Sequence, residues 1–383
     1  MALDLVLISW NIGGARWLEL ADNHSGDSIY ASREELKREL NVELNELIRK
    51  YNPDVVTLQE VVDYSFDGKQ QNRDSLINAP PHYKYLSAMI VDSIQHPHLD
   101  KWRNVREKGR WPNAAAFCQG NAFLVREDLH VVPVTSLSRV GVTFKDWLEF
   151  FLPGADEKIY NQSLLSNVYL ESGLYFGDRD TEPRSCSVLH LVLPNVIQST
   201  SRIKRPLDVF VLNIHLTKLV AESLGPEESK RKAAKQGTLV RSKQFERILS
   251  DIVLRREKWQ KDGFPVRGRV TVPNQFETCD RYAPLWIALG DFNFAPTSKE
   301  YKQITDKYFI DINPEENIPT KMSKIDSCFT EIVDYVFLRP SFQSGKDLGL
   351  GYRVAGQAFP CTNANMVSDH YPILARIKIE IKE

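Results

Sequence analysis

Polar side chains capable of metal binding or acid–base chemistry follow five short apolar runs that are spread along the whole chain. They are acids, amides and imidazoles, namely Asn11, Glu60, His215, Asp291 with Asn293, and Asp369 with His370. Runs of β-branched and large apolar residues are typical of core strands. A hydrophilic group at the end of such a strand is expected at the rim of the sheet, because burying it costs free energy. If the ends of these five strands converge on one pocket, their side chains would suit the binding of a hard divalent cation and the hydrolysis of a phosphate ester.

The elements that must position these residues alternate between strand and helix. The segment 32–50 has one apolar stripe at helical spacing, and Ser32 with Glu35 forms a capping box. Asn52-Pro53 ends this helix just before the run that carries Glu60. A strand, a helix and a strand within about sixty residues indicate an α/β unit whose helix covers a sheet face.

Further strands are predicted at 122–125, 187–193, 333–338 and 373–379, and a second amphipathic helix at 238–256. Two helices and many short strands favour two sheets packed face to face, with helices on the outer faces. The expected fold class is therefore α/β.

The candidate residues extend from Asn11 to His370, so a domain boundary between them would split the pocket. We therefore expect a single domain over residues 1–383, with insertions near 132–182 and 257–283. The first insertion is rich in aromatic residues and is expected to be ordered, because long structureless loops are uncommon in compact domains. The second has no clear period and is predicted as a loop.

The composition limits the class of protein. Lys and Arg total 49 against 50 Asp and Glu, a formal net charge of -1, which excludes a globally basic nucleic-acid binder but not a local basic surface. Five widely spaced cysteines without a Cys-x-x-Cys pair suggest reduced thiols and argue against a zinc site. No basic leader and no apolar run of ~20 residues is present, so a cytoplasmic protein without stable membrane association is expected.

Six motifs together resemble the endonuclease/exonuclease/phosphatase superfamily, which includes pancreatic-type deoxyribonuclease, apurinic endonucleases, neutral sphingomyelinases, inositol polyphosphate 5-phosphatases and deadenylases. They are Trp10-Asn11, Leu58-Gln59-Glu60-Val61, Gly120-Asn121-Ala122, Asn213-x-His215-Leu216, Gly290-Asp291-Phe292-Asn293 and Ser368-Asp369-His370. They keep the family's order and cover nearly the whole chain. The resemblance implies a deoxyribonuclease-like four-layer α/β sandwich, two packed mixed β-sheets flanked by helices, with magnesium-dependent phosphoester hydrolysis. It leaves the substrate open, since the superfamily uses one site on very different molecules.

The metal side of the site is assigned to three residues by this resemblance. Glu60 would bind Mg²⁺ directly, with Mn²⁺ as a possible substitute, because magnesium takes oxygen ligands and few protein carboxylates. Asn11 matches the family amide beside that metal, and Asp369 is expected to face the metal or a water. The alternatives are an exposed glutamate after a strand and a turn-forming asparagine before Gly13-Gly14.

The catalytic side includes Asp291, which would orient or deprotonate the attacking water, and Asn293, which would donate to a phosphate oxygen. Side chains two residues apart share one face of a strand, although an Asx turn is the alternative for this pair. His370 can donate to a phosphate oxygen or accept the proton of the water. Asp334 resembles the acid that fixes the tautomer of His370, and His215 would stabilise charge on the phosphoryl oxygens.

Three further residues are predicted to bind substrate. Arg184 resembles a family arginine that faces the phosphate, and its fork could bind two oxygens. Asn121 resembles a family amide near the site, with a strand-end turn as an equal alternative. Asn213 shares a face with His215 and completes this group.

Two features bear on the substrate. Basic residues cluster after the strand that bears His215, at Lys230, Arg231, Lys232, Lys235, Arg241 and Lys243. They could neutralise phosphates of a polynucleotide, or they could form an ordinary solvated helix face. The aromatic residues of 132–182 could stack on bases, insert into a lipid surface or pack on their own domain.

The leading hypothesis is a metal-dependent phosphodiesterase that attacks phosphorus with water, a nuclease with DNA or RNA as its substrate and partner. The basic run fits this hypothesis, and no lipidation signal or membrane-seeking helix is visible. No protein partner can be inferred. The alternatives are a phosphoesterase acting on phospholipids, like a sphingomyelinase, or on inositol phosphates, and a catalytically silent binding scaffold. The intact Glu60, Asp291, Asn293 and His370 argue against the scaffold.

Overall fold

The structure of the chain is a computed structural model, and the residues that it describes form two large sheets and three principal helices. These residues are 2–13, 33–65, 73–92, 116–132, 165–170, 184–196, 205–219, 222, 226–254, 257, 284–313, 318–322, 329–340, 352–362 and 367–381. None of the described helices is long and apolar enough to cross a membrane.

The first sheet has seven strands in the order β15-β16-β1-β2-β5-β4, with β3 paired to β2. Its strands are β1 (Ala2–Asn11), β2 (Val55–Ser65), β3 (Arg73–Ser75), β4 (Tyr83–Asp92), β5 (Ala116–Arg126), β15 (Tyr352–Pro360) and β16 (Ile373–Ile381). The β1–β2 pair is parallel and the other pairs are antiparallel. The sheet is therefore mixed, as the sequence predicts.

The second sheet also has seven strands, in the order β11-β14-β10-β9-β8-β6, with β7 paired to β8. Its strands are β6 (Val131–Val132), β7 (Leu165–Leu170), β8 (Arg184–Val196), β9 (Arg205–His215), β10 (Leu285–Asp291), β11 (Ile310–Asp311) and β14 (Asp334–Pro340). Only β9 and β10 run parallel within it. A separate two-stranded sheet joins β12 (Lys321–Met322) to β13 (Phe329–Glu331).

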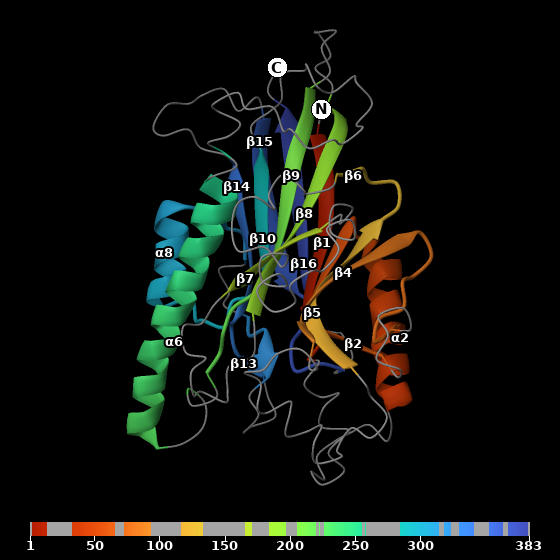
Figure 1. Ribbon diagram of the computed structural model, residues 1–383. Helices are drawn as coiled ribbons and strands as arrows, with labels where there is room; N and C mark the ends of the chain where they lie inside the picture. Colours follow the sequence, from red (N-terminus) through yellow and green to blue (C-terminus); the bar gives the residue numbers. More distant parts are fainter. Residues whose placement is uncertain are drawn as a thin grey trace, which may run out of the picture.

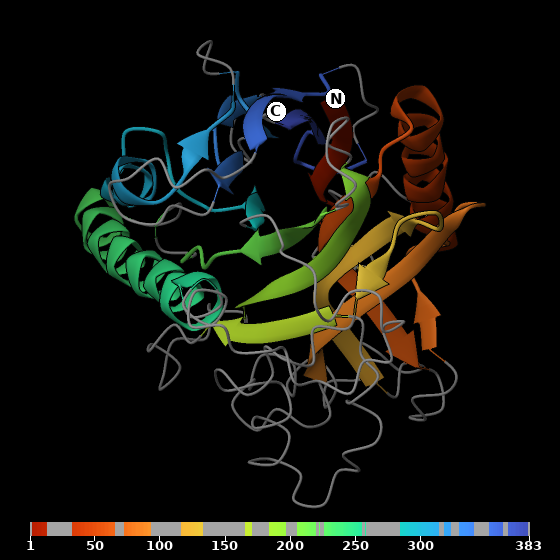
Figure 2. The ribbon, with the colours of Figure 1, turned by 90° about the horizontal axis from the view of Figure 1, so that it is seen from above.

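Helices cover both outer faces, which makes four layers. Helix α2 (Arg33–Tyr51) lies outside the first sheet, and α6 (Glu227–Ile248) and α8 (Lys299–Lys307) lie outside the second (Figures 1 and 2). Helix α6 continues into a π-helical turn, η3 (Leu249–Leu254). It begins well before the predicted 238–256 segment. The first turns after Pro226 carry exposed charged residues and few apolar ones, so the apolar stripe on which the prediction was based starts later in the helix.

Three apolar cores fill the spaces between these four layers. Leu40 and Leu44 of α2 pack with the outward side chains of the first sheet. Phe245 of α6 and Ile304 of α8 do the same for the second sheet. Alternate strand residues point inward, and these form the core between the sheets, as Leu7 of β1 does. Burial of both faces explains why the strands read as nearly continuous apolar runs.

Strand register brings the candidate residues together at one end of the sandwich. Asp291 at the end of β10 lies opposite His215 at the end of β9, and opposite Asp334 at the start of β14. In the other sheet, Asn11 at the end of β1 pairs with Gln59 of β2. The chain segment before β16 bears His370 and lies at the same rim.

Parts of the predicted organisation fall outside the described residues. Of the insertion near 132–182 only Val132 and β7 are described, and almost all of 257–283 is not. The capping role of Ser32 likewise lies outside the described residues. The single domain over residues 1–383 stays a prediction.

Candidate active site

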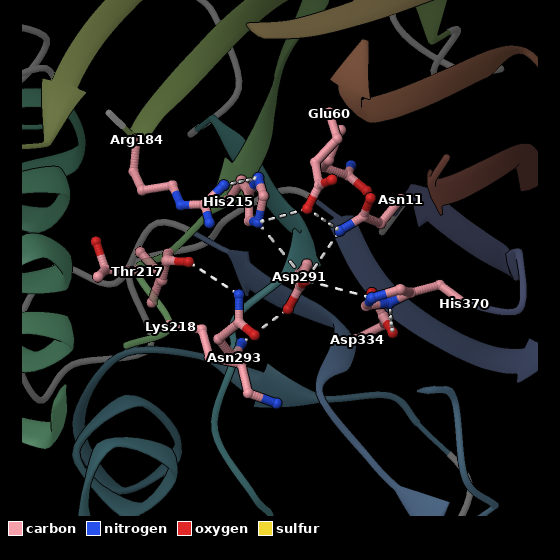
Figure 3. Close-up of polar contacts among 12 residues, drawn as sticks. Asn11, Glu60, Arg184, His215, Thr217, Lys218, Asp291, Asn293, Asp334 and His370 are labelled. Atoms are coloured by element: carbon pink, nitrogen blue, oxygen red, sulfur yellow. Dashed lines mark hydrogen bonds and ion pairs between the residues drawn. The ribbon is translucent and has the colours of Figure 1, made fainter. Parts of the chain in front are cut away.

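Asp291 lies at the centre of the converging side chains (Figure 3). Its Oδ2 accepts a hydrogen bond from Asn11 Nδ2 at 3.0 Å. The same oxygen is 3.6 Å from His215 Nε2 and 3.7 Å from His370 Nε2. Burial acts to raise the pKa of Asp291, but the nearby His370 and Lys321 charges outweigh it and the pKa is lowered. Asp291 is therefore an ionised carboxylate between two imidazoles.

Glu60 reaches the same site from a distorted part of β2. The β2–β5 pairing shifts register between Leu58 and Val61, and Glu60 has a left-handed φ of 56°. Such backbone is unfavourable for a non-glycine residue and is found most often where function holds it. Glu60 Oε1 accepts from Asn11 Nδ2 at 3.2 Å and lies 3.6 Å from His215 Nε2. The bulge thus turns the carboxylate of Glu60 from β2 into the pocket.

Asn11 holds the two carboxylates of the site in place. Its Nδ2 donates to both Glu60 and Asp291, and its Oδ1 accepts from the Gly13 N–H at 3.0 Å. The amide nitrogen rather than the oxygen therefore faces the pocket. This geometry favours a role in orienting Glu60, and direct metal ligation by Asn11 stays a prediction.

His370 and Asp334 form a buried dyad. His370 Nδ1 and Asp334 Oδ2 are 2.9 Å apart, which leaves Nε2 to face Asp291. Burial acts to lower the pKa of His370, but the carboxylate of Asp334 outweighs it and the pKa is raised. Trp10 Nε1 donates to the His370 carbonyl at 3.0 Å, and Thr320 Oγ1 accepts from the Asp334 N–H at 3.2 Å. The backbone on both sides of the dyad is thus fixed.

His215 is paired with Arg184. Arg184 Nη1 lies 3.0 Å from His215 Nδ1, and the arginine is 8% exposed. Since guanidinium only donates, Nδ1 accepts and the proton of neutral His215 sits on Nε2. Burial, followed by Arg184, lowers the pKa of His215 well below its ordinary value. His215 is therefore a neutral donor aimed at Glu60 and Asp291.

The Asp291–Asn293 pair forms an Asx turn and still places both side chains at the site. The Asn293 N–H donates to Asp291 Oδ1 at 2.9 Å, and Asn293 has a φ of 53°. Its Nδ2 donates to Leu216 O at 2.9 Å, while its buried Oδ1 has no hydrogen-bond partner among the described residues. The preceding Gly290, with φ 138°, allows β10 to approach β9 closely, because a Cβ there would lie 2.0 Å from Ile214 O. The turn that sequence offered as an alternative is thus how the pair is positioned.

Asn213 and Asn121 connect the two sheets beneath the site. Asn213 is fully buried, and its Nδ2 donates to Leu58 O and Ala122 O at 3.0 Å each. Its Oδ1 accepts from Gln59 Nε2 at 2.7 Å. Asn121 Nδ2 donates to the carbonyls of Ser185 and Asn213. Their amide hydrogens thus link the two sheets, and contact of either residue with substrate stays a prediction.

One residue of the predicted basic cluster is buried and paired with acidic residues in the structure. Arg241 is 4% exposed, and it pairs with Glu222 at 2.9 Å and with Glu300 at 3.0 Å. It therefore ties α6 to α8 and is not available to a polynucleotide. The exposed basic residues of α6 are Arg231, Lys232, Lys235 and Lys243.

Sequence reasoning missed Thr320 and Lys321. They lie beside the dyad, where Lys321 bridges to His370 through the backbone. Strand β12 is only two residues long, and no apolar run precedes it, so no sequence signal marked either residue. Asp369 is partly exposed and attracts the Lys321 ammonium. Its predicted contact with a metal stays a prediction.

The donor set fits a divalent cation. Ligand atoms of Asp291, Asp334 and His370 all lie within 4.8 Å of one another, and Glu60 adds a carboxylate whose side chain is 15% exposed. The unpartnered Oδ1 of Asn293 offers a further acceptor for a metal-bound water. Magnesium takes oxygen ligands and few protein carboxylates, so Glu60 and Asp291 suit it, whereas Asp334 and His370 are already paired with each other.

A comparison with protein-family models identifies the family of the chain. The Endonuclease/Exonuclease/phosphatase family model matches residues 8–370, so the chain belongs to this family, whose members hydrolyse phosphoester bonds. No curated protein sequence matches the chain.

Similar solved structures include three that cover almost the whole chain. A family protein from Bacteroides thetaiotaomicron is 13% identical, with a TM-score of 0.45, over 99% of this chain and 98% of its own. The human Nocturnin catalytic domain with bound sulfate is 14% identical, with a TM-score of 0.45, over 99% and 96%. ANGEL2, a 2',3'-cyclic phosphatase in complex with adenosine-2',3'-vanadate, is 15% identical, with a TM-score of 0.49, over 99% and 97%.

Proposed function

We propose that the protein is a magnesium-dependent nuclease, a phosphodiesterase that cleaves nucleic acid by attack of water on phosphorus. The observation that carries this proposal is the position of the ionised Asp291 between two imidazoles, 3.6 Å and 3.7 Å away. This arrangement can accept a proton from water on one side and donate to phosphate oxygens on the others. No side chain with a nucleophilic hydroxyl or thiol is needed for such a single displacement.

Each protein group has a distinct task in this reaction. Asp291 orients the attacking water and takes its proton. His370, held by Asp334, and His215, held by Arg184, donate from Nε2 to the oxygens that gain negative charge. Mg²⁺ bound by Glu60, with Asp369 as an expected contact, would supply Lewis-acid stabilisation of the same charge.

Surface charge supports nucleic acid as the substrate. The exposed basic residues of α6, except Lys243, lie in its first turns, which Figure 1 places at the lower end of the sandwich. A basic surface at this end would hold phosphates that flank the cleaved one. The buried free thiols of Cys186 and Cys361 suit a reducing compartment, and a cytoplasmic location is part of the proposal.

A substrate panel with Mg²⁺ or Mn²⁺ tests this function. It would contain supercoiled, linear and abasic DNA, RNA, sphingomyelin and inositol phosphates. Wild-type protein is expected to cleave a polynucleotide, and His370→Ala to lose about 100-fold or more, while retaining the fold. His130→Ala removes an exposed imidazole and serves as the matched control. Headgroup release without cleavage of DNA or RNA would overturn the proposal.

A further inference from the structure

Lys321 is a positively charged residue at the site, and the proposed reaction assigns no role to it. Its main chain is bridged to His370 and pairs with Glu331 of β13. Next to it, the Tyr371 N–H donates to Thr320 O at 2.8 Å. The backbone of Lys321 is therefore held directly against the segment that carries His370.

The side chain of Lys321 lies among the acids of the pocket. Burial acts to lower the pKa of Lys321, but attraction by Asp291, Asp369, Glu60 and Asp334 outweighs it and the pKa is raised. The lysine in turn affects the pKa of both site imidazoles. These partners come from β2, β10, β14 and the segment before β16, which agrees with the backbone bridge that places Lys321 beside His370.

The ammonium is near these carboxylates without being bound by one. It forms no hydrogen bond or ion pair with any described residue, and Lys321 is partly exposed. By contrast, Lys218, the other lysine near the site, is held by Glu331 at 2.8 Å. Three N–H donors of Lys321 thus stay available to a ligand that enters the pocket.

Charge explains why a ligand anion would use them. A phosphodiester carries a negative charge and must approach several carboxylates, which repel it. On the His215 side Arg184 offsets this repulsion, and on the His370 side Lys321 is the cation placed to do so. Arg184 is thus paired with His215, and Lys321 lies beside His370.

We propose that Lys321 is a substrate-contacting residue whose ammonium donates to a non-bridging oxygen of the phosphodiester on the His370 side of the site. This inference rests on the proposed function, since it names a further contact within the same site. A lysine acts here as a mobile point charge, so the contact adds affinity for phosphate without requiring one fixed orientation. The competing explanation is that Lys321 only neutralises the acids and supports the fold.

The test compares Lys321→Met and Lys321→Arg with the wild type and with Lys302→Met, which removes an exposed lysine of α8. Steady-state kinetics on an oligonucleotide would be measured together with the binding of inorganic phosphate by calorimetry in Mg²⁺. A charged hydrogen bond to phosphate corresponds to about a 10- to 100-fold effect. We expect Lys321→Met to lose this factor in kcat/KM and in phosphate affinity, Lys321→Arg to recover part of it, and Lys302→Met to match the wild type.

The outcomes separate the two proposals. Phosphate binding that is unchanged in folded Lys321→Met overturns the contact, whatever the kinetics show. A wild type that cleaves no polynucleotide but binds phosphate through Lys321 refutes the nuclease and leaves the contact standing. If Lys321→Met does not fold, Lys321→Gln, which keeps a donor and loses the charge, takes its place with the same expected loss.

Discussion

Replacement of Asp334 by Asn isolates the contribution of the buried dyad. The carboxylate lies 2.9 Å from His370 Nδ1, and the two residues are only 4% and 3% exposed. Asn keeps the size of the side chain and removes its charge. An amide carries no charge to stabilise the imidazolium of His370, and it can turn its N–H towards Nδ1, so the charged donor at Nε2 is lost or the ring is no longer held in place. The change therefore acts on the orientation and protonation of His370 and not on packing.

The size of the effect follows from what His370 is expected to do. A positioned general acid or base contributes about 10²- to 10⁴-fold to a rate. Because Asp334 makes the hydrogen bond that holds Nδ1, we expect Asp334→Asn to lose most of this factor in kcat, which corresponds to roughly 3–5 kcal/mol of barrier. Burial raises the pKa of Asp334, so its ionised form is costly in the folded state, and loss of the charge should leave the fold intact.

The assay is cleavage of a fluorescent oligonucleotide in Mg²⁺, with circular dichroism and thermal melting to confirm folding. Asp306→Asn, which alters an exposed carboxylate of α8, is the control and should behave like the wild type. A folded Asp334→Asn protein with kcat within about twofold of the wild type would show that the dyad does not serve the reaction, and the reasoning from its geometry would be wrong.

Three further changes test other parts of the structure. Gly290→Ala should destabilise the fold by about 1–3 kcal/mol or more in urea unfolding, because the new Cβ meets Ile214 O; wild-type stability would contradict the close approach of β10 to β9. Burial is the main cause that raises the pKa of Glu43 to about 8, so the folded state binds a proton between about pH 4.5 and 8 that the unfolded chain has lost, and stability falls as pH rises through this window. The melting temperature of Glu43→Gln should therefore exceed that of the wild type by an amount that grows from pH 5 to pH 8. A difference in melting temperature that stays constant would refute this. Asn213→Ala should lower the free energy of unfolding by about 2 kcal/mol or more, because Gln59 and two carbonyls lose their partner; a higher KM at unchanged stability would instead support direct substrate contact.

The fold and the centre of the site could be predicted because the same feature encodes both. An apolar run fixes a buried strand, and the polar residue that ends it lies at the rim, so His215 and Asp291 were found with β9 and β10. Glu60 was found in the same way, although it lies at a bulge within β2 and not at its end. The strand register then brings the site residues together, since Asp291 lies opposite His215 on β9 and Asp334 on β14. The four layers follow from helices whose apolar stripes cover only one face each.

Other features depend on contacts that no local pattern reveals. Lys321 lies on a two-residue strand, and its importance comes from where the chain passes and not from its neighbours in sequence. Arg241 resembled the exposed basic residues around it, and only packing of α6 against α8 shows its pairing with Glu300. For Asn213, strand alternation shows which face the side chain takes but not that it bonds to Gln59 and to two carbonyls of the other sheet.

Metal-dependent cleavage of supercoiled plasmid by wild-type protein and by Glu60→Gln is the most direct single measurement. Glu60 is the carboxylate that a distorted strand holds in the pocket, and Gln keeps its shape while removing the charge that binds a cation. We predict nicking that requires Mg²⁺, stops with a chelator and is lost in Glu60→Gln. Nicking by Glu60→Gln at the wild-type rate, or nicking that continues without a divalent cation, would contradict the proposed site.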